Sequence, residues 1–319
     1  MDLEALRERA EIIRRIRNFF DGRNYLECDT PLLAPALIPE TCLEVFETSL
    51  IPPEGSRRKA EKRWLVPSPE VWMKKLLARH GVSLYQICKC FRNGESAGRL
   101  HSPEFTMLEY YTIDAGYLDS LALPEELFDS LPERDRFPRG PFERLTMEEA
   151  FVRWAGFSLE RAAAEGSAAM AEEARRLGLD PPAGLDTAAL YDLVFIHAVE
   201  PHLRGDRVIA LLDYPAFAPC LAKKSPGKGR AERWECYYNG IELANCYSEE
   251  DDCSVVRSYF GAEGKAKAAS ALVPHDVDGE YWRIFERFPR CSGVALGVDR
   301  LIMALWGVSS IDGVIPFPL

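Results

Sequence analysis

The stretch "ECYYNGIE" most constrains the fold, because it carries the signal of a tight β-hairpin. Asn239 and Gly240 form a two-residue turn between alternating residues, and both tolerate the left-handed backbone that such a turn needs. The turn pairs Tyr237 with Glu242, and Glu235 shares the face of Tyr237. A chain with this hairpin contains an antiparallel pair of strands.

The rest of the chain mixes short strands with helices. Helical spacing of Leu6, Ala10, Ile13, Ile16 and Phe20 predicts a first helix over 3–20. Boundary residues predict a second helix between Pro69 and Gly81, and further helical stretches cover 253–269, 278–288 and the end of "CSGVALGVDRLIMALWG". Strands are expected in "YLECDTPLL", over 84–92, over 105–112 and before the last helix, with a polar loop over 52–63.

This order of elements favours an α+β fold with an antiparallel sheet flanked by helices over a parallel sheet. We expect one domain over residues 1–319, with a mostly helical insertion at about 119–204 that is rich in Ala, Glu and Leu.

Composition excludes several broad classes. A net charge of −11 disfavours a general nucleic-acid coat, although a local basic groove stays possible. No run of about 18 apolar residues occurs, and the charged start is no signal peptide, so we expect a cytoplasmic protein without a membrane span. Nine cysteines without a Cys-x-x-Cys pair indicate reduced thiols, with a zinc site as the alternative.

A first group of polar residues surrounds the long loop between the strands at 84–92 and 105–112. Arg92 stands where the first strand ends, and Arg92 and His101 could hold phosphate. Glu109 and Tyr111 are two residues apart on the second strand, so they share a face that could hold an ammonium group. The alternative is a solvated hairpin with ordinary surface charges.

A second group lies on the Asn-Gly hairpin. Glu235 and Glu242 become diagonal neighbours across the two strands, which is unfavourable unless a cation lies between them. Magnesium with a nucleotide phosphate fits that position, and a wet sheet face is the alternative. Glu249 has the opposite parity to Glu242, so it joins the same face only if a bulge or strand end intervenes.

A third group follows in "SGVALGVDR". Gly293 and Gly297 remove side chains where a ligand or another backbone approaches, and Arg300 stands at the start of a helix. That setting suits a phosphate or a stacked base, although close helix packing explains the glycines as well. The chain has no P-loop motif.

Taken in order, "FRN…HSPEFTMLEYY", "GIELAN" and "GVALGVDRL" resemble class II aminoacyl-tRNA synthetases, and most closely the lysyl-tRNA synthetase catalytic core. "YLECDTPLL" looks like the first motif of that class, with Pro31 at the dimer interface. This motif begins near residue 20, so we expect no anticodon-binding barrel before it. "SPE" at 68–70, "GIELAN" and "SGVALGVDR" resemble the elongation factor P lysine ligases of this class.

The resemblance implies ATP, Mg²⁺ and a homodimer. It implies activation of (R)-β-lysine or lysine as an adenylate, followed by transfer to a lysine side chain of elongation factor P. Arg92 and Arg300 would be catalytic, and Glu235 and Glu242 would bind the metal. The ATP-binding residues would be Arg92, Asn93, Glu95, His101, Ser102, Phe105, Glu242, Leu243, Gly297 and Arg300. The residues that bind the amino acid would be Ser68, Glu70, Glu109, Tyr111, Asn245, Glu249 and Ala295.

Three departures from the family pattern bear on these roles. The segment between "FRN" and His101 is one residue longer, which shifts the match of Glu95 by one position. Ser102 replaces an asparagine and has a shorter reach. Ala295 replaces a glycine of lysyl-tRNA synthetases, and its methyl group is expected to favour β-lysine over α-lysine.

Two other functions remain in view. The enzyme could load another acceptor, a tRNA or a small molecule, although the net charge and the expected lack of an anticodon domain make tRNA binding unlikely. The second alternative is a regulatory paralogue without catalytic activity. The joint presence of Arg92, Glu235, Glu242 and Arg300 argues against it.

Overall fold

The structure, a computed structural model, describes residues 1–95, 98–132 and 137–318. The chain divides into two compact units. The first comprises Met1–Asp114, Glu250–Met303 and Val308–Leu319, and the second comprises Ala115–Glu249 and Ala304–Gly307. Because the first unit is assembled from separate stretches, a single cut cannot separate the two units. One catalytic domain over 1–319 stays a prediction.

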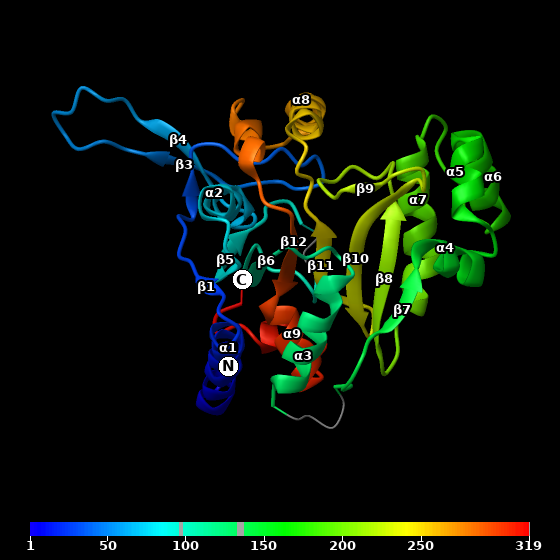
Figure 1. Ribbon diagram of the computed structural model, residues 1–319, viewed down its shortest axis with the longest axis horizontal. Helices are drawn as coiled ribbons and strands as arrows, with labels where there is room; N and C mark the ends of the chain where they lie inside the picture. Colours follow the sequence, from blue (N-terminus) through cyan, green and yellow to red (C-terminus); the bar gives the residue numbers. More distant parts are fainter. Residues whose placement is uncertain (96–97, 133–136, 319) are drawn as a thin grey trace. The chain divides into compact units, whose positions relative to one another are not determined.

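The first unit contains a sheet whose strands are ordered β1 (Leu26–Glu27), β5 (Leu84–Phe91), β6 (Glu104–Ile113) and β12 (Cys291–Gly297) (Figure 1). β5, β6 and β12 are antiparallel, and only the short β1 pairs with β5 in parallel. The strands predicted over 84–92 and 105–112 are thus confirmed. "YLECDTPLL" forms less strand than expected, only β1 and part of β2 (Leu33–Ala34).

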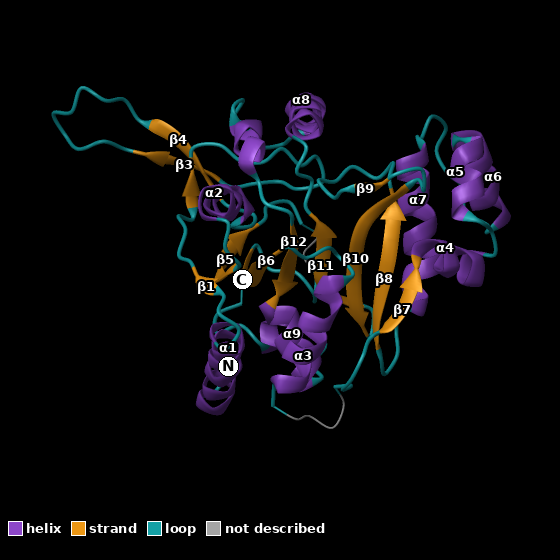
Figure 2. Cartoon of the chain, in the orientation of Figure 1, coloured by secondary structure: helices purple, strands orange, loops and turns teal. Residues whose placement is uncertain are grey.

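The helices of this unit are α1 (Leu3–Asp21), α2 (Glu70–His80), α8 (Cys253–Ser270) and the first turns of α9 (Val298–Trp306) (Figure 2). A 3₁₀ segment at Tyr281–Arg287 follows α8 in the sequence. α2 ends at Gly81, whose φ of 60° is the left-handed cap that its sequence predicts. The predicted polar loop over 52–63 is partly wrong, because β4 (Glu61–Leu65) begins inside it. β4 pairs with β3 (Glu47–Leu50) and β2 in a separate small sheet.

α1 buries only part of the predicted face, which includes Ile16 and Phe20. Leu6 and Ala10 are exposed, whereas Arg9 is buried. The Arg9 guanidinium forms an ion pair of 2.6 Å with Asp299 and donates to Thr106 Oγ1 at 3.0 Å. Asp299 also accepts a hydrogen bond from the Thr106 backbone at 2.6 Å. Apolar spacing could not reveal this face, because a buried ion pair stands within it.

The second unit contains a sheet in the order β11 (Ile241–Ser248), β10 (Arg230–Tyr238), β8 (Val208–Pro215) and β7 (Glu143–Thr146), with β9 (Lys224–Ser225) on β10. β7 runs parallel to β8, and the other pairs are antiparallel. Asn239 and Gly240 have φ of 49° and 76°, so the predicted hairpin turn is confirmed.

The segment predicted as a helical insertion is mostly helical, with β7 as its strand. Its helices are α3 (Ala122–Ser130), α4 (Met147–Ala150), α5 (Leu159–Glu165), α6 (Ser167–Arg176) and α7 (Thr187–Val194), with short 3₁₀ and π turns between them. Its apolar side chains pack with Ile209, Leu211 and Tyr214 of β8 in one core. No helix in the described part of the chain is long and apolar enough to span a membrane.

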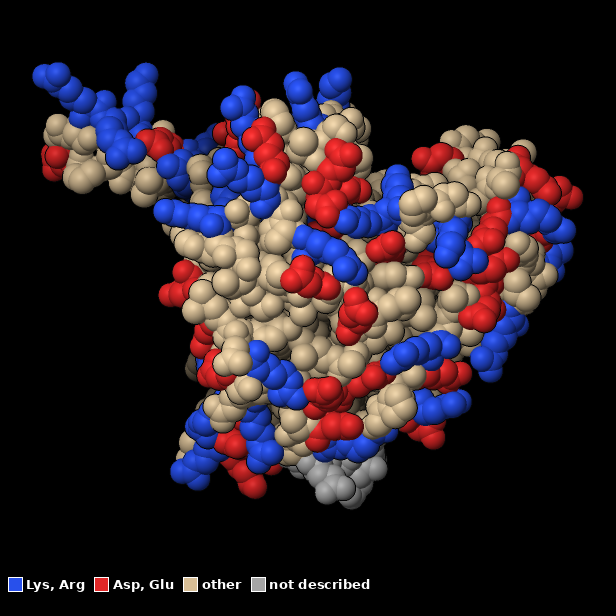
Figure 3. Space-filling view, viewed as in Figure 1, with Lys and Arg blue, Asp and Glu red and all other residues tan. Residues whose placement is uncertain are grey.

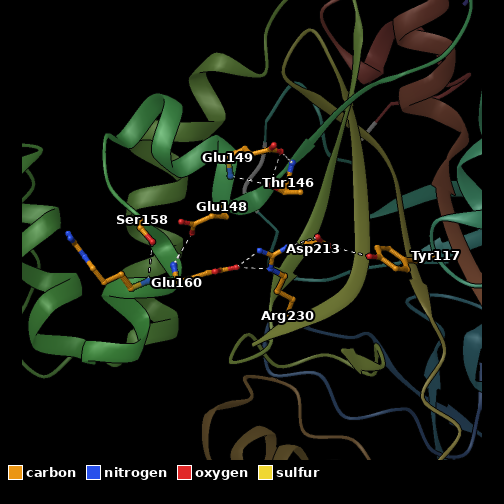
Figure 4. Close-up of polar contacts among 9 residues, drawn as sticks. Tyr117, Thr146, Glu148, Glu149, Ser158, Glu160, Asp213 and Arg230 are labelled. Carbon is orange, nitrogen blue, oxygen red and sulfur yellow. Dashed lines mark hydrogen bonds and ion pairs between the residues drawn. The ribbon is translucent and has the colours of Figure 1, made fainter. Parts of the chain in front are cut away.

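A chain of polar contacts fastens α5 to the sheet of the second unit (Figure 4). The Arg230 guanidinium binds Glu160 of α5 at 2.5 Å and Asp213 of β8 at 3.0 Å. Asp213 also accepts a hydrogen bond from the Tyr117 hydroxyl at 2.6 Å. Glu148 accepts one from the Glu160 backbone at 2.9 Å. These charges compensate one another, so they stabilise the insertion.

Candidate active site

One face of the first unit's sheet combines large polar side chains on β6 with almost no side chain on β12. In the strand register Tyr111 lies opposite Gly293, and Glu109 lies opposite Ala295. Gly297 continues this row of β12. The largest group that β12 presents in this row is therefore the Ala295 methyl. The Glu109 carboxylate therefore meets little side-chain bulk from β12.

Glu109 is buried, with 3% of its surface exposed to solvent, and it accepts a hydrogen bond of 2.6 Å from the Tyr111 hydroxyl. Burial raises the pKa of Glu109 well above its ordinary value, and the charge of Glu70 raises it further. Glu70 begins α2, and its backbone N–H donates a hydrogen bond of 3.4 Å to the Ser68 hydroxyl oxygen. Its carboxylate pairs with the buried Lys74 at 2.5 Å. The predicted neighbours Glu70, Glu109 and Tyr111 thus lie in one electrostatic environment.

Sequence reasoning missed two members of this environment, Glu40 and Lys74. Burial raises the pKa of Glu40 to about 7, the charge of Glu70 adds to the rise, and Arg92 and Lys74 oppose it. Lys74 could have been found, because it stands four residues after Glu70 on a predicted helix. Glu40 lies in an irregular segment, where spacing carries no such signal. The carboxylates here outnumber the lysine, which suits a ligand that carries ammonium groups.

A cationic group lies at the end of β5, where the sequence predicts phosphate binding. The Arg300 guanidinium donates to His101 Nε2 at 2.9 Å. Arg92 and His101 both approach Glu95, at 3.7 Å and 3.9 Å. Arg92 also lies over the ring of Phe105 at 5.2 Å. The structure therefore brings together the predicted residues of this group.

The protonation state of His101 follows from these contacts. Burial lowers the pKa of His101, and the charge of Arg300 lowers it further, while Glu95 opposes the change. A neutral imidazole can accept the Arg300 hydrogen bond at Nε2, whereas a charged one cannot. His101 can thus hold the guanidinium in place without adding a charge.

Arg92 has an unused hydrogen-bond donor. Its Nε is buried and meets no hydrogen-bond partner within the described ranges. A buried donor of this kind costs free energy unless a ligand satisfies it, and a phosphate oxygen would do so. The donor set therefore fits ATP.

The remaining predicted nucleotide residues of this unit lie close in sequence to that group. Asn93 follows Arg92 and bonds to the backbone of Glu44, and Ser102 is buried. Gly297 has only ordinary contacts with Arg300 where a Cβ would stand. The extra residue predicted within 94–100 falls in a segment of which 96–97 lie outside the described residues.

In the second unit a β-bulge changes the predicted register of the hairpin. Glu242 pairs with Tyr237 as predicted, but Glu235 pairs with Asn245, because Leu243 is an extra residue in β11. Glu242, Asn245 and Glu249 consequently fall on one parity. This bulge is the irregularity that Glu249 requires. The Leu243 side chain is buried, so only its backbone is available to a ligand.

The two carboxylates predicted to bind Mg²⁺ differ in their surroundings. Glu235 already accepts hydrogen bonds from the Tyr214 and Tyr237 hydroxyls at 2.6 Å and 2.5 Å, and from Arg233 at 2.5 Å. It therefore does not offer the open carboxylate that a direct metal ligand needs, whereas Glu242 is only partly buried. No group of three or more His, Cys, Asp or Glu side chains in the described residues could hold a metal. Metal binding by Glu235 and Glu242 stays a prediction.

The family model described as tRNA synthetases class II (D, K and N) matches residues 3–319, and the chain belongs to that family. It is similar to proteins named elongation factor P–(R)-β-lysine ligase. Identity is 37% to the one from Avibacterium paragallinarum, over 99% of this chain and 96% of that protein. Identity is 38% to the one from Proteus mirabilis, over 98% of this chain and 94% of that protein. The predicted resemblance and the class II fold are confirmed.

Proposed function

We propose that this protein is an ATP-dependent ligase that activates (R)-β-lysine as an adenylate and transfers it to a lysine side chain of elongation factor P. The names of the similar proteins support the substrate and the acceptor. The observation that carries the proposal is the row in which Ala295 faces Glu109. There a carboxylate that could bind an ammonium group lies opposite the small Ala295 side chain.

In the first step, a carboxylate oxygen of the amino acid attacks the α-phosphorus of ATP, and pyrophosphate leaves. Arg92 and Arg300 bind phosphate oxygens and stabilise the negative charge that develops on them. Neutral His101 holds the Arg300 guanidinium in position at 2.9 Å. Glu70 binds the amine nearer the carboxylate, and Glu109, Tyr111 and Glu249 bind the distal ammonium.

In the second step, the neutral amine of the acceptor lysine attacks the carbonyl carbon of the mixed anhydride. An amide bond forms, AMP leaves with the electron pair of the broken bond, and the amine loses a proton. No covalent intermediate with the enzyme is needed. Mg²⁺, when bound, would offset phosphate charge, and Glu235 and Glu242 are its predicted ligands.

The proposal also includes a homodimer in the cytoplasm. Leu3 of α1, Leu26 of β1 and Leu33 of β2 are exposed apolar residues in the segments that the family resemblance assigns to the dimer interface. Burial of these side chains against a second copy would remove apolar surface from water.

Pyrophosphate exchange with ATP, Mg²⁺ and either lysine isomer tests the first step, and labelling of elongation factor P tests the second. Exchange without labelling would favour another acceptor. No exchange with either amino acid would favour a regulatory paralogue, although the unsatisfied Arg92 Nε favours an enzyme that binds an anion.

A further inference from the structure

The hairpin of β3 and β4 is rich in cations, although the chain has a net charge of −11. Between Glu47 and Leu65 the sequence holds five cations and three carboxylates. The cations are Arg57, Arg58, Lys59, Lys62 and Arg63. Lys and Arg side chains gather at the outer end of this hairpin (Figure 3), which projects from the rest of its unit (Figure 1). We call residues 47–65 the basic arm.

Two cations of the basic arm are available to a partner. Arg57 and Lys59 are exposed, and neither forms an ion pair with a carboxylate in the ranges that the structure describes. The other cations pair within the arm: Arg58 and Arg63 with Glu61, and Lys62 with Glu47. The positive potential at the end of the arm therefore comes mainly from Arg57 and Lys59.

The chain segments on either side of the basic arm are both fixed beside Arg92. On one side, the Asn93 backbone donates to the carbonyl of Glu44 at 2.9 Å. On the other side, the Phe91 backbone donates to the carbonyl of Val66 at 3.0 Å. The arm thus begins near a residue that we assign to the phosphates of ATP. An extended leg from Val45 to Pro53 spans at most about 29 Å.

The arm also has features of a protein-binding surface. Leu50 and Ile51 are exposed apolar residues, at 45% and 77% exposure. Arginine beside apolar side chains is a common composition of protein interfaces. The only aromatic residue of the arm, Trp64, is 1% exposed, so the arm offers no ring on which a nucleic-acid base could stack. These features favour a protein partner over RNA.

We propose that the basic arm is a docking site for an acidic surface of the acceptor protein. This inference rests on the proposed function, because it assumes that the activated amino acid passes to a protein. Opposite charges on the two surfaces would accelerate their encounter, and the anchorage of the arm beside Arg92 would keep the bound acceptor near the adenylate.

The test compares the full-length protein with the double variant Arg57→Glu/Lys59→Glu. A control variant, Arg175→Glu/Lys265→Glu, changes the net charge equally at exposed positions of α6 and α8. Four quantities are measured at low and high salt: pyrophosphate exchange, transfer to elongation factor P, binding of elongation factor P, and binding of RNA. We expect the arm variant to keep its exchange rate and to lose about tenfold in kcat/KM for the acceptor at low salt. This difference should shrink at high salt, and the control should resemble wild type.

Transfer and binding that are unchanged in the arm variant would overturn the proposal and leave the proposed function standing. An equal loss in both variants would also overturn it, since net charge alone would then explain the effect. A variant that lost binding of RNA, with transfer unchanged, would assign the arm to RNA instead. If wild type bound elongation factor P through the arm without transferring β-lysine to it, the docking site would stand and the proposed function would fall.

Discussion

Asp299 and Arg300 are neighbours in the sequence with separate tasks. Asp299 is 1% exposed, and its ion pair with Arg9 joins α1 to the start of α9. Arg300 is only partly buried and points its guanidinium at His101. At the start of α9, Asp299 therefore stabilises the fold and Arg300 serves the proposed reaction. Substitution of each residue by itself can separate the two roles.

Arg300→Ala is expected to reduce pyrophosphate exchange by about 10²-fold or more, because it removes a preorganised cation from the phosphate site. Its melting temperature should change little. The contrasting variant Asp299→Ala should lose about 3–5 kcal/mol of stability, because it leaves Arg9 buried and unpaired. Thermal melts and exchange assays check both. Early melting of Arg300→Ala with activity preserved in the cold would show that Arg300 is structural.

Ala295→Gly is expected to shift preference from β-lysine toward α-lysine. The Ala295 methyl would take space that an α-amino acid could use near its amino and carboxylate groups, whereas a β-amino acid places that amine one carbon further along the chain. One methyl group of fit is worth about 1–3 kcal/mol, or about 10- to 200-fold in preference. Pyrophosphate exchange with both amino acids on both proteins measures the ratio, and an unchanged ratio of catalytic efficiencies would refute this role.

Glu40 predicts a pH-dependent stability of the ligand-free protein. Its pKa rises from 4.5 to about 7 on folding, so the folded state holds the proton more tightly. The resulting stabilisation is complete below about 4.5 and is lost as the pH rises through about 7. Glu40→Gln has no carboxyl group to titrate, so it does not lose this stabilisation. Its melting temperature relative to that of wild type should therefore rise as the pH increases from about 4.5 to about 7. A difference that stays constant with pH would contradict the assignment.

At the scale of elements, the hairpin of β10 and β11 contains one feature that the sequence predicts, its turn, and one that it does not, its bulge. Asn239 and Gly240 predict the turn and its first pairs, because the turn type depends on these two residues alone. The bulge at Leu243 has no such local signal, since it depends on which side chains are buried on each face. The sequence alone therefore could not decide on which face of the sheet the residues after the bulge lie, and Glu249 is one of them.

The bulge makes a prediction for Glu249. Glu249→Gln should raise the Michaelis constant for β-lysine far more than that for ATP, because it removes a charge partner of the distal ammonium. An order-of-magnitude loss for the amino acid is expected from the usual 1.5–3 kcal/mol of a charged hydrogen bond, or roughly 10- to 100-fold. Steady-state kinetics with each substrate varied in turn give both constants. An unchanged constant for the amino acid would place Glu249 outside the site.

At the scale of the molecule, the class II fold could be predicted because its motifs are local and ordered along the chain. Arg92 follows the end of β5 and Arg300 stands in the first turn of α9, whereas Glu109 lies within β6. The buried pair of Arg9 and Asp299 and the carboxyl of Glu40 could not be predicted, because their partners come from distant segments. Long-range contacts also build the first unit from separate stretches of the chain.

The transfer reaction tests the proposed function most directly. Purified protein is incubated with ATP, Mg²⁺, labelled (R)-β-lysine and elongation factor P, and the mass of elongation factor P is measured. We predict a mass increase by one β-lysyl group on a lysine side chain, dependent on ATP and absent with Arg300→Ala. Formation of pyrophosphate with elongation factor P unmodified would contradict the proposed acceptor, and no reaction of wild type with either lysine isomer would contradict the ligase itself.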